Sequence, residues 1–145
     1  MIDLAAWVKV NWLFLTILLA ISLALASIAG AFFPETYVRD SPSMGAQGVG
    51  QDLVDLFLAV PLLLISFFYL SRGSRLAILI YGGTVGYIMY SFIIYCFGVH
   101  FNQFFLLYCL TLSLSLFAFI LLISELRQMQ VESWFEAVPV KLISV

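Results

Sequence analysis

Charged residues are scarce in this chain: they make up 10% of its 145 residues, with six basic and eight acidic side chains. A soluble domain carries about 25% charged residues. Hydrophobic residues make up 64% of the chain, and a compact domain of this size still exposes roughly a third of the surface of its unfolded chain. Because that surface would be largely apolar, the shortage of charge excludes a soluble globular domain and favours the lipid bilayer as solvent.

The chain also lacks a basic excess and has few soft metal ligands. Its net charge of −2 leaves no basic surface to neutralise phosphates, so we exclude nucleic acid as a partner. The one histidine is His100, and the two cysteines, Cys96 and Cys109, do not form a CxxC pair. We therefore expect no metal site and no cofactor.

Apolar residues gather in four runs, each near the ~20 residues that a helix needs to cross the hydrocarbon core. The predicted fold is all-α, an integral membrane bundle of four antiparallel transmembrane helices forming one membrane domain, 1–145. The predicted helices cover about 11–33, 53–71, 76–98 and 104–124.

The first apolar run has a second interpretation, as a cleaved secretory signal. Lys9 precedes it, and Ala24-Leu25-Ala26 resembles a small-residue cleavage site. The run continues past that site through Phe33, however. This continuation favours a helix that is retained.

Basic residues near helix ends indicate which connections stay in the cytoplasm. Arg39 is the one basic residue on one side of the predicted bundle; the other side carries Lys9, Arg72, Arg75, Arg127 and Lys141. The split predicts a multi-pass protein of the cell (inner) membrane with both termini cytoplasmic.

The connections carry turn signals. Pro34, Pro42 and three glycines make the stretch 34–52 typical of a loop on the outer side. Gly73 is expected to end the second helix and Ser74 to cap the third. Asn102 is the expected cap of the fourth.

The tail over 125–145 has a different pattern from the predicted spans. Apolar side chains recur at helical spacing in Val131, Trp134, Phe135 and Val138. Such spacing predicts a short amphipathic helix lying along the inner membrane surface.

Small residues indicate where helices approach closely, because association in lipid depends on packing and polar contacts. The candidates are Ser22, Ala26 and Gly30 in the first helix, and Gly82 and Gly86 in the third. Both sets could join helices within one chain or join two copies of the chain. Contacts within one chain are favoured. Pro61 in the second helix removes a backbone donor and predicts a bend, either as fixed shape or as a hinge.

Polar residues at membrane depth usually face the bundle interior or a water-filled cavity. Here they converge on the outer half: Asp52, Asp55, Tyr87, Tyr90, Ser91, Tyr95, His100, Asn102, Tyr108 and Thr111. This clustering predicts a tyrosine-lined cavity open to the outer side, whose acidic character would favour a small cation or an amine.

Each of these residues also has a structural interpretation. Asp52 would cap the second helix, and Asp55 would interact with its dipole. Tyrosines often anchor helices at the membrane interface. A lone histidine in a turn, as His100 is, is usually solvated.

Helix geometry argues against a disulfide between the two cysteines. Counted from the turn between the third and fourth helices, Cys96 and Cys109 differ in height by roughly 7 Å at 1.5 Å per residue. A disulfide usually needs a closer approach of the α-carbons. We predict two free, buried thiols.

The succession Gly50-Gln51-Asp52, Pro61-Leu62-Leu63, Arg72-Gly73-Ser74, Tyr87-Ile88-Met89-Tyr90 and Phe101-Asn102 before Phe105-Leu106 resembles a pattern in small, functionally uncharacterised prokaryotic membrane proteins. The resemblance covers 50 to about 120. It implies a four-helix membrane fold and brings no activity with it.

Three classes of function remain. The first is a protein that binds or transports a small solute or cation in the outer cavity, working as a homo-oligomer. The second is an accessory subunit of a larger membrane complex. The third, an enzyme acting on lipid or quinone, has least support, because no nucleophile and base pair or phosphate-binding loop stands at a recognised spacing.

Overall fold

The computed structural model describes residues 4–128, and within that range the chain is helical and contains no strand. Its elements are α1 (Leu4–Phe32), η1 (Pro34–Tyr37), α2 (Pro42–Val54), η2 (Asp55–Ala59), α3 (Val60–Leu70), α4 (Arg75–Phe97) and α5 (Phe105–Gln128). A short 3-10 helix forms η1, and η2 is a π-helical turn that joins α2 to α3 in one continuous rod.

Within residues 4–128, four helical rods are long and apolar enough to cross a membrane: Asn11–Phe32, Pro42–Leu70, Arg75–Phe97 and Phe105–Arg127. The predicted all-α fold with four membrane-length helices is therefore confirmed. The predicted amphipathic helix of the tail lies outside the described residues.

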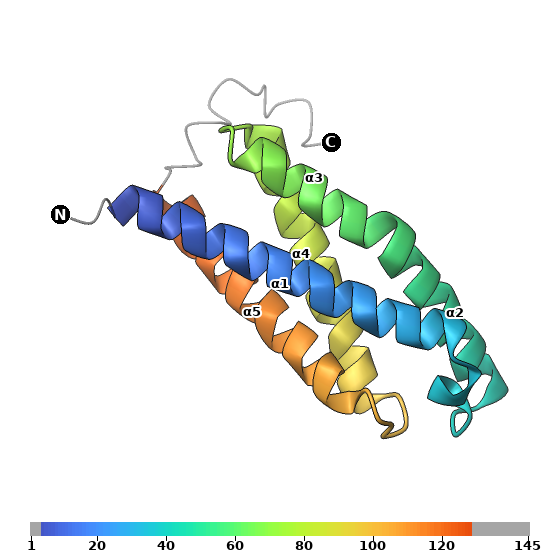
Figure 1. Ribbon diagram of the computed structural model, residues 1–145. Coiled ribbons are helices and arrows are strands. Elements are labelled where there is room, and N and C mark those ends of the chain that lie inside the picture. The colour runs from blue at the N-terminus through green and yellow to red at the C-terminus, as the bar shows by residue number, and fades with distance from the viewer. Residues whose placement is uncertain (1–3, 129–145) are drawn as a thin grey trace, which may run out of the picture.

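The rods pack as a bundle around α4 and α1. On either side of α4 lie α3 and α5, and α1 packs against α5, α2 and α3, as can be followed in Figure 1. We call the end with the 71–74 turn the Gly73 end. The opposite end, formed by residues 33–41 and 98–104, is the His100 end.

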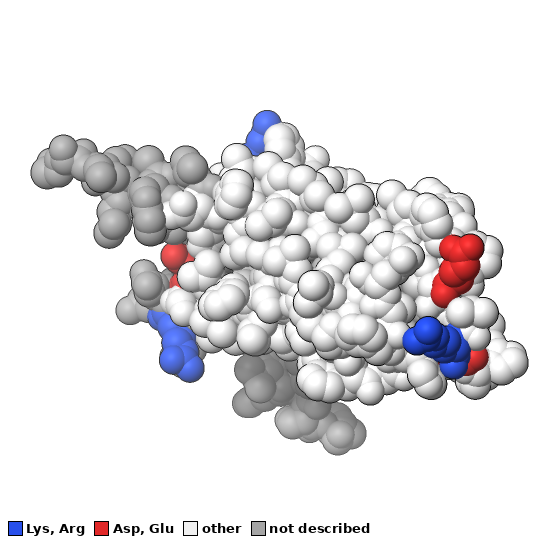
Figure 2. Space-filling model, turned by 60° about the horizontal axis from the view of Figure 1, so that its bottom comes forward, with Lys and Arg blue, Asp and Glu red and all other residues white. Residues whose placement is uncertain are grey.

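The surface fits a membrane environment. Large apolar side chains are exposed along all four rods. On the face shown in Figure 2, charged side chains gather toward the two ends of the bundle, with a wide uncharged surface between them. Since lipid tails solvate apolar side chains, this distribution matches a multi-pass membrane protein.

The second rod begins at Pro42 rather than near residue 53, so the prediction of a loop over 34–52 is wrong from Pro42 onward. Ser41 caps this helix by accepting a hydrogen bond from the Met44 backbone N–H at 3.2 Å. Pro42 occupies the first turn, where its missing N–H costs nothing. The Ser-Pro pair is thus a helix start.

Gly48 of α2 serves close packing rather than a turn. A Cβ on Gly48 would lie 2.8 Å from the Tyr37 ring, and one on Gly45 would lie 3.4 Å from the Tyr37 Cβ. The absence of a side chain at Gly48 lets the Tyr37 ring of η1 pack onto α2, whereas the contact at Gly45 is an ordinary one. This is why a glycine-rich stretch remains helical here.

Pro61 is the second residue after the π-helical turn, which ends at Ala59. The Val60 N–H donates to the Asp55 carbonyl, five residues back. The wider turn inserts one extra residue and changes which side chains face the bundle, a feature often found at functional sites.

Small residues bring α4 close to α5. A Cβ on Gly82 would come within 2.7 Å of Leu122, and one on Gly86 would lie 3.6 Å from Phe119. Gly73 has a positive φ of 83° and lies in the turn between α3 and α4, as expected. Ser74 caps α4 through the Ala77 N–H at 3.4 Å.

The thiols of Cys96 and Cys109 are free, as predicted, but both residues are partly exposed rather than buried, and the height argument behind the prediction is wrong. Their sulfur atoms lie 3.9 Å apart. The calculation started the fourth helix at Asn102, whereas α5 starts at Phe105. The later start removes much of the expected height difference.

Candidate functional site

Asp52 and Asp55, the two aspartates of the second rod, are both 0% exposed. Because α2 begins at Pro42, they lie in its last turn and in η2, far from the helix start. The capping role considered for Asp52 is therefore wrong, since Ser41 caps the helix. Their burial within a membrane-length rod requires hydrogen-bond donors from other parts of the chain.

Asp52 receives two phenolic hydrogen bonds, one on each oxygen. The Tyr37 hydroxyl donates to Oδ2 at 2.5 Å, and the Tyr95 hydroxyl donates to Oδ1 at 2.9 Å. Tyr37 comes from η1 and Tyr95 from α4, so this carboxylate joins three elements. Hydrogen bonds to an ionised group are about twice as strong as neutral ones.

Gly30 of α1 completes the surroundings of Asp52. A Cβ at this position would collide with the Asp52 carboxylate and would lie 2.6 Å from the Tyr37 hydroxyl oxygen. Glycine is therefore the residue that lets α1 pass beside the carboxylate. Gly30 is predicted to lie at a close helix contact, and in the structure the group it faces is the Asp52 carboxylate.

Asp55 is less fully satisfied than Asp52. Its Oδ1 accepts hydrogen bonds from the Tyr87 hydroxyl at 2.8 Å and from Gln51 Nε2 at 3.1 Å. Its Oδ2 is buried and has no hydrogen-bond partner among residues 4–128. An unsatisfied buried acceptor costs about 1–3 kcal/mol, and more when it is charged.

Gln51 connects the groups around Asp55. Besides that carboxylate, its Nε2 donates to the Tyr87 hydroxyl and to Ser91 Oγ, the latter at 3.3 Å. The amide thereby ties α2 to α4 beside the π-helical turn. We call Asp52, Asp55 and their partners Tyr37, Tyr95, Tyr87, Gln51 and Ser91 the carboxylate cluster.

Tyr37 lies in η1, outside the membrane-length rods. Burial raises the pKa of Tyr37 well above its usual range, and the negative charge of Asp52 raises it further. The phenol therefore keeps its proton. Tyr37 acts as a hydrogen-bond donor toward Asp52 at any ordinary pH.

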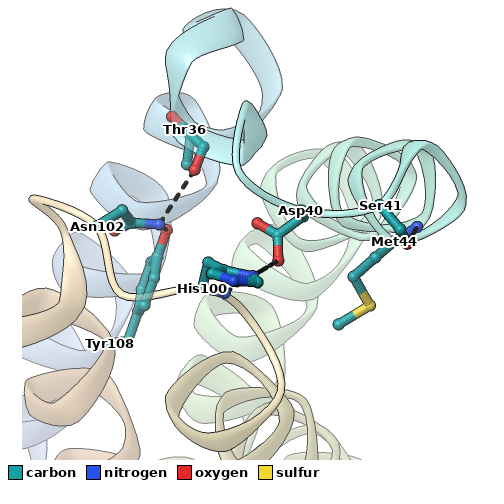
Figure 3. A network of polar contacts seen from close by, with 7 residues as sticks. All are labelled: Thr36, Asp40, Ser41, Met44, His100, Asn102 and Tyr108. Atoms are coloured by element: carbon teal, nitrogen blue, oxygen red, sulfur yellow. Dashed lines mark hydrogen bonds and ion pairs between the residues drawn. The ribbon is translucent and has the colours of Figure 1, made fainter.

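A second polar network lies at the His100 end, drawn in Figure 3. The Asp40 side chain is 3% exposed and accepts from the His100 backbone N–H at 2.9 Å, with His100 Nδ1 3.3 Å away. Asn102 Nδ2 donates to the Thr36 carbonyl at 3.2 Å and to the Tyr108 hydroxyl at 3.3 Å. These contacts join the connection before α2 to the connection before α5.

An open pocket of about 380 Å³ is found at this end, lined by Glu35, Thr36, Val38, Arg39, His100, Phe101, Asn102 and Gln103. Tyr108, which bonds Asn102, has its ring centroid 5.2 Å from that of Tyr95. Polar groups therefore continue from the pocket to Asp52, although the aspartate itself is closed off from solvent.

A second hollow of about 330 Å³ lies between the second rod and α4, lined by Val54, Leu58, Ala59, Leu62, Ile80, Gly83, Thr84 and Tyr87. Its lining is apolar except for Thr84 and Tyr87. Tyr87 thus stands between this hollow and Asp55, to which its hydroxyl donates.

The structure brings together some of the predicted site residues and separates others. Asp52, Asp55, Tyr87, Ser91 and Tyr95 meet in the carboxylate cluster. Asn102 and Tyr108 lie in the network at the His100 end, where His100 pairs with Asp40. Tyr90 is 64% exposed on the outside of the bundle, and the Thr111 hydroxyl donates to the Leu107 carbonyl of its own helix.

Sequence reasoning missed Tyr37, Gln51 and Asp40. Tyr37 falls in the stretch 34–52, which the sequence predicts to be a loop and to which no neighbour can be assigned. Gln51 was assigned to the same loop, yet it precedes Asp55 by four residues, the spacing at which helical side chains meet. That signal becomes readable once the helix is known to start at Pro42.

Among the described residues, no group of three or more His, Cys, Asp and Glu side chains lies close enough to hold a metal ion. The cluster instead combines two carboxylates with phenols, an amide and a hydroxyl. Such a set can hold a proton, or a small cation that carboxylate and hydroxyl oxygens can surround. Comparisons with protein-family models, with curated proteins and with solved structures found no match for this chain.

Proposed function

We propose that this chain is a multi-pass membrane protein that binds a small cation at the carboxylate cluster, with Asp55 as the binding group. The observation that carries the proposal is the buried Asp55 Oδ2, which lacks a hydrogen-bond partner among residues 4–128. A buried carboxylate is normally paired, protonated or bound to a cation. A proton on Oδ2 would remove the buried charge, and a small cation would supply the missing partner.

The two aspartates would then have different roles. Both oxygens of Asp52 are already engaged by Tyr37 and Tyr95, which makes this carboxylate the structural member. Asp55 has one engaged and one unengaged oxygen. A proton is the cation that the cluster can accept without rearrangement, and a larger cation or an amine would require Tyr87 or Gln51 to move.

The arrangement of polar groups supports entry from the His100 end. Asn102 lines the open pocket and bonds Tyr108, whose ring meets that of Tyr95. Tyr95 donates to Asp52, one helical turn from Asp55. A cation would need only local movement of these side chains to pass from the pocket to the cluster.

The test compares the parent with Asp55→Asn, a nearly isosteric change, in detergent micelles. Thermal unfolding is followed in lithium, sodium and potassium chloride and in methylammonium chloride, with choline chloride balancing ionic strength. Infrared spectra of the same samples report a protonated buried carboxyl. A ligand at about 100 times its Kd stabilises the folded state by ~2.7 kcal/mol.

We expect the parent to show either a cation-dependent rise in Tm or the infrared band, and Asp55→Asn to lose it. Asp40→Asn is the matched control, because Asp40 Oδ2 is also buried without a partner among residues 4–128 but lies at the His100 end outside the cluster. An identical response in the parent and in Asp55→Asn contradicts the proposal. No response in the parent also contradicts it and favours the accessory-subunit interpretation.

We also propose that the His100 end faces the outside of the cell membrane and that both termini are cytoplasmic. The antiparallel rods put Arg72, Arg75 and Arg127 at the Gly73 end and Arg39 at the opposite end, which agrees with the bias of basic residues toward the cytoplasm. A protease-cleavable tag after Val145 should resist external protease in intact cells and be cut after lysis. Cleavage in intact cells contradicts this orientation.

A further inference from the structure

Two thiols from different helices meet near the His100 end. Cys96 stands one residue before the end of α4, and Cys109 lies in the first turns of α5. Their sulfur atoms are 3.9 Å apart, and both residues are partly exposed. The contact is independent of the carboxylate cluster, since neither thiol touches an aspartate in the hydrogen bonds of the described residues.

The distance is close to what bond formation needs. An S–S bond is about 2.0 Å long, and cysteine reaches different positions by rotation about a single side-chain torsion. Sulfur atoms already in van der Waals contact can therefore bond after a small side-chain adjustment. The two cysteines come from α4 and α5, which pack against each other in the bundle.

We propose that Cys96 and Cys109 form a reversible dithiol–disulfide pair that crosslinks α4 to α5. The oxidant is a disulfide, carried by a small molecule or by a thiol-oxidising protein. One thiolate attacks the oxidant and forms a mixed disulfide while the first oxidant thiol leaves. The second thiolate then displaces the other oxidant thiol, so that two S–H bonds and the oxidant S–S bond are lost, and one protein S–S bond and two thiols form.

The pair stands beside residues that connect the His100 end to Asp52. Tyr95 precedes Cys96 and donates to Asp52, and Tyr108 precedes Cys109 and bonds Asn102. The rings of these tyrosines contact each other, with centroids 5.2 Å apart. A crosslink at the adjacent residues would hold the two helix ends, and hence the two rings, in their present arrangement.

The test treats the folded, detergent-solubilised protein with 4,4′-dithiodipyridine, a small apolar disulfide. Intact mass is measured before and after treatment, and unreacted thiols are then alkylated with maleimide after unfolding in SDS. We expect the monomer to lose the mass of two hydrogen atoms, to take up no maleimide, and to regain two alkylation sites after reduction. The oxidised parent should also unfold at a higher temperature than the reduced parent, because the bond limits the unfolded chain.

Cys96→Ser and Cys109→Ser are the matched controls, and each should keep one thiol and show no such rise in Tm. Two alkylated thiols, or stable adducts of the reagent on both sulfurs, would overturn the proposal, as would oxidation solely to crosslinked dimers. The parent oxidised after unfolding shows that the reagent is competent. Asp55→Asn should form the bond as readily as the parent, so the outcome of the disulfide test is independent of the proposed cation binding.

Discussion

The two halves of the bundle satisfy their buried polar groups in different ways. Toward the Gly73 end, neutral hydroxyls bond within their own helix or in a single pair: Ser66 donates to the Leu63 carbonyl, and Thr16 meets the Tyr81 hydroxyl at 2.8 Å. Toward the His100 end, two carboxylates take their donors from η1, α2 and α4. A neutral hydroxyl can bond to a nearby carbonyl, but a carboxylate accepts only and needs donors from elsewhere. The hydrogen bonds in the half toward the His100 end therefore depend on how several elements are placed together.

The largest expected effect comes from a methyl group placed beside Asp52. Gly30→Ala should lower the free energy of unfolding by about 3 kcal/mol or more, because the new Cβ would overlap the carboxylate and approach the Tyr37 hydroxyl. Reversible unfolding by SDS in mixed micelles measures it. Gly50→Ala, whose Cβ would meet nothing within 4 Å, is the control. Equal tolerance of both changes would show that the cluster is loosely packed.

The next effect compares a hydrogen bond to a carboxylate with a hydrogen bond between two hydroxyls. Tyr95→Phe removes a donor to Asp52 and should cost about 2 kcal/mol, whereas Tyr81→Phe removes the bond with Thr16 and should cost about 1 kcal/mol. Both tyrosines are buried, so the loss of packing is matched. The same unfolding assay compares them. Equal costs would mean that the two halves do not differ in the strength of their polar contacts.

A smaller effect is expected at the start of α2, which carries Asp52 to its place. Ser41→Ala removes the cap on the Met44 N–H and should lower the free energy of unfolding by about 1 kcal/mol. Ser43→Ala changes a neighbouring exposed serine in the first turn and should stay within about 0.5 kcal/mol of the parent. Thermal unfolding followed by circular dichroism distinguishes them. A harmless Ser41→Ala would indicate that tertiary contacts alone define the helix start.

The smallest effect should come from the exposed imidazole of His100, which lies beside Asp40 at the His100 end. His100→Ala should change the free energy of unfolding by no more than about 0.5 kcal/mol, since its side chain is 66% exposed and exposed pairs contribute little. The backbone N–H at this position still donates to Asp40 after the change. Asp40→Ala, which removes the buried acceptor, should cost more. A larger loss for His100→Ala would show that the imidazole contributes to the stability of this end.

Much of the fold could be predicted from the sequence because lipid imposes a simple rule on length and hydropathy. The number of membrane-length helices, the turn at Gly73 and the cap at Ser74 all follow from local residues. The region 42–52 could not be assigned correctly, because Gly45 and Gly48 are equally typical of a loop and of a helix that receives an aromatic ring. The position of the Tyr37 ring decides between the loop and the helix. That position depends on η1 folding back onto α2.

The sequence predicted part of the candidate site. Asp52, Asp55 and the tyrosines of α4 stood out as polar residues at membrane depth, but periodicity could not distinguish the inward Tyr87 from the exposed Tyr90. The cysteine pair shows a related difficulty. A shift of the start of α5 by three residues changed the expected separation of Cys96 and Cys109, and no local signal defined that start.

Composition and hydropathy alone determined that this chain belongs in a membrane and folds as four apolar helical rods, because those properties depend on the solvent and on each segment by itself. Tertiary structure alone decided which donors reach Asp52 and Asp55, which glycine stands beside a carboxylate, and which thiols touch. Those outcomes depend on how several helices are placed together, and angular differences within one turn determine whether a side chain meets a partner or the lipid.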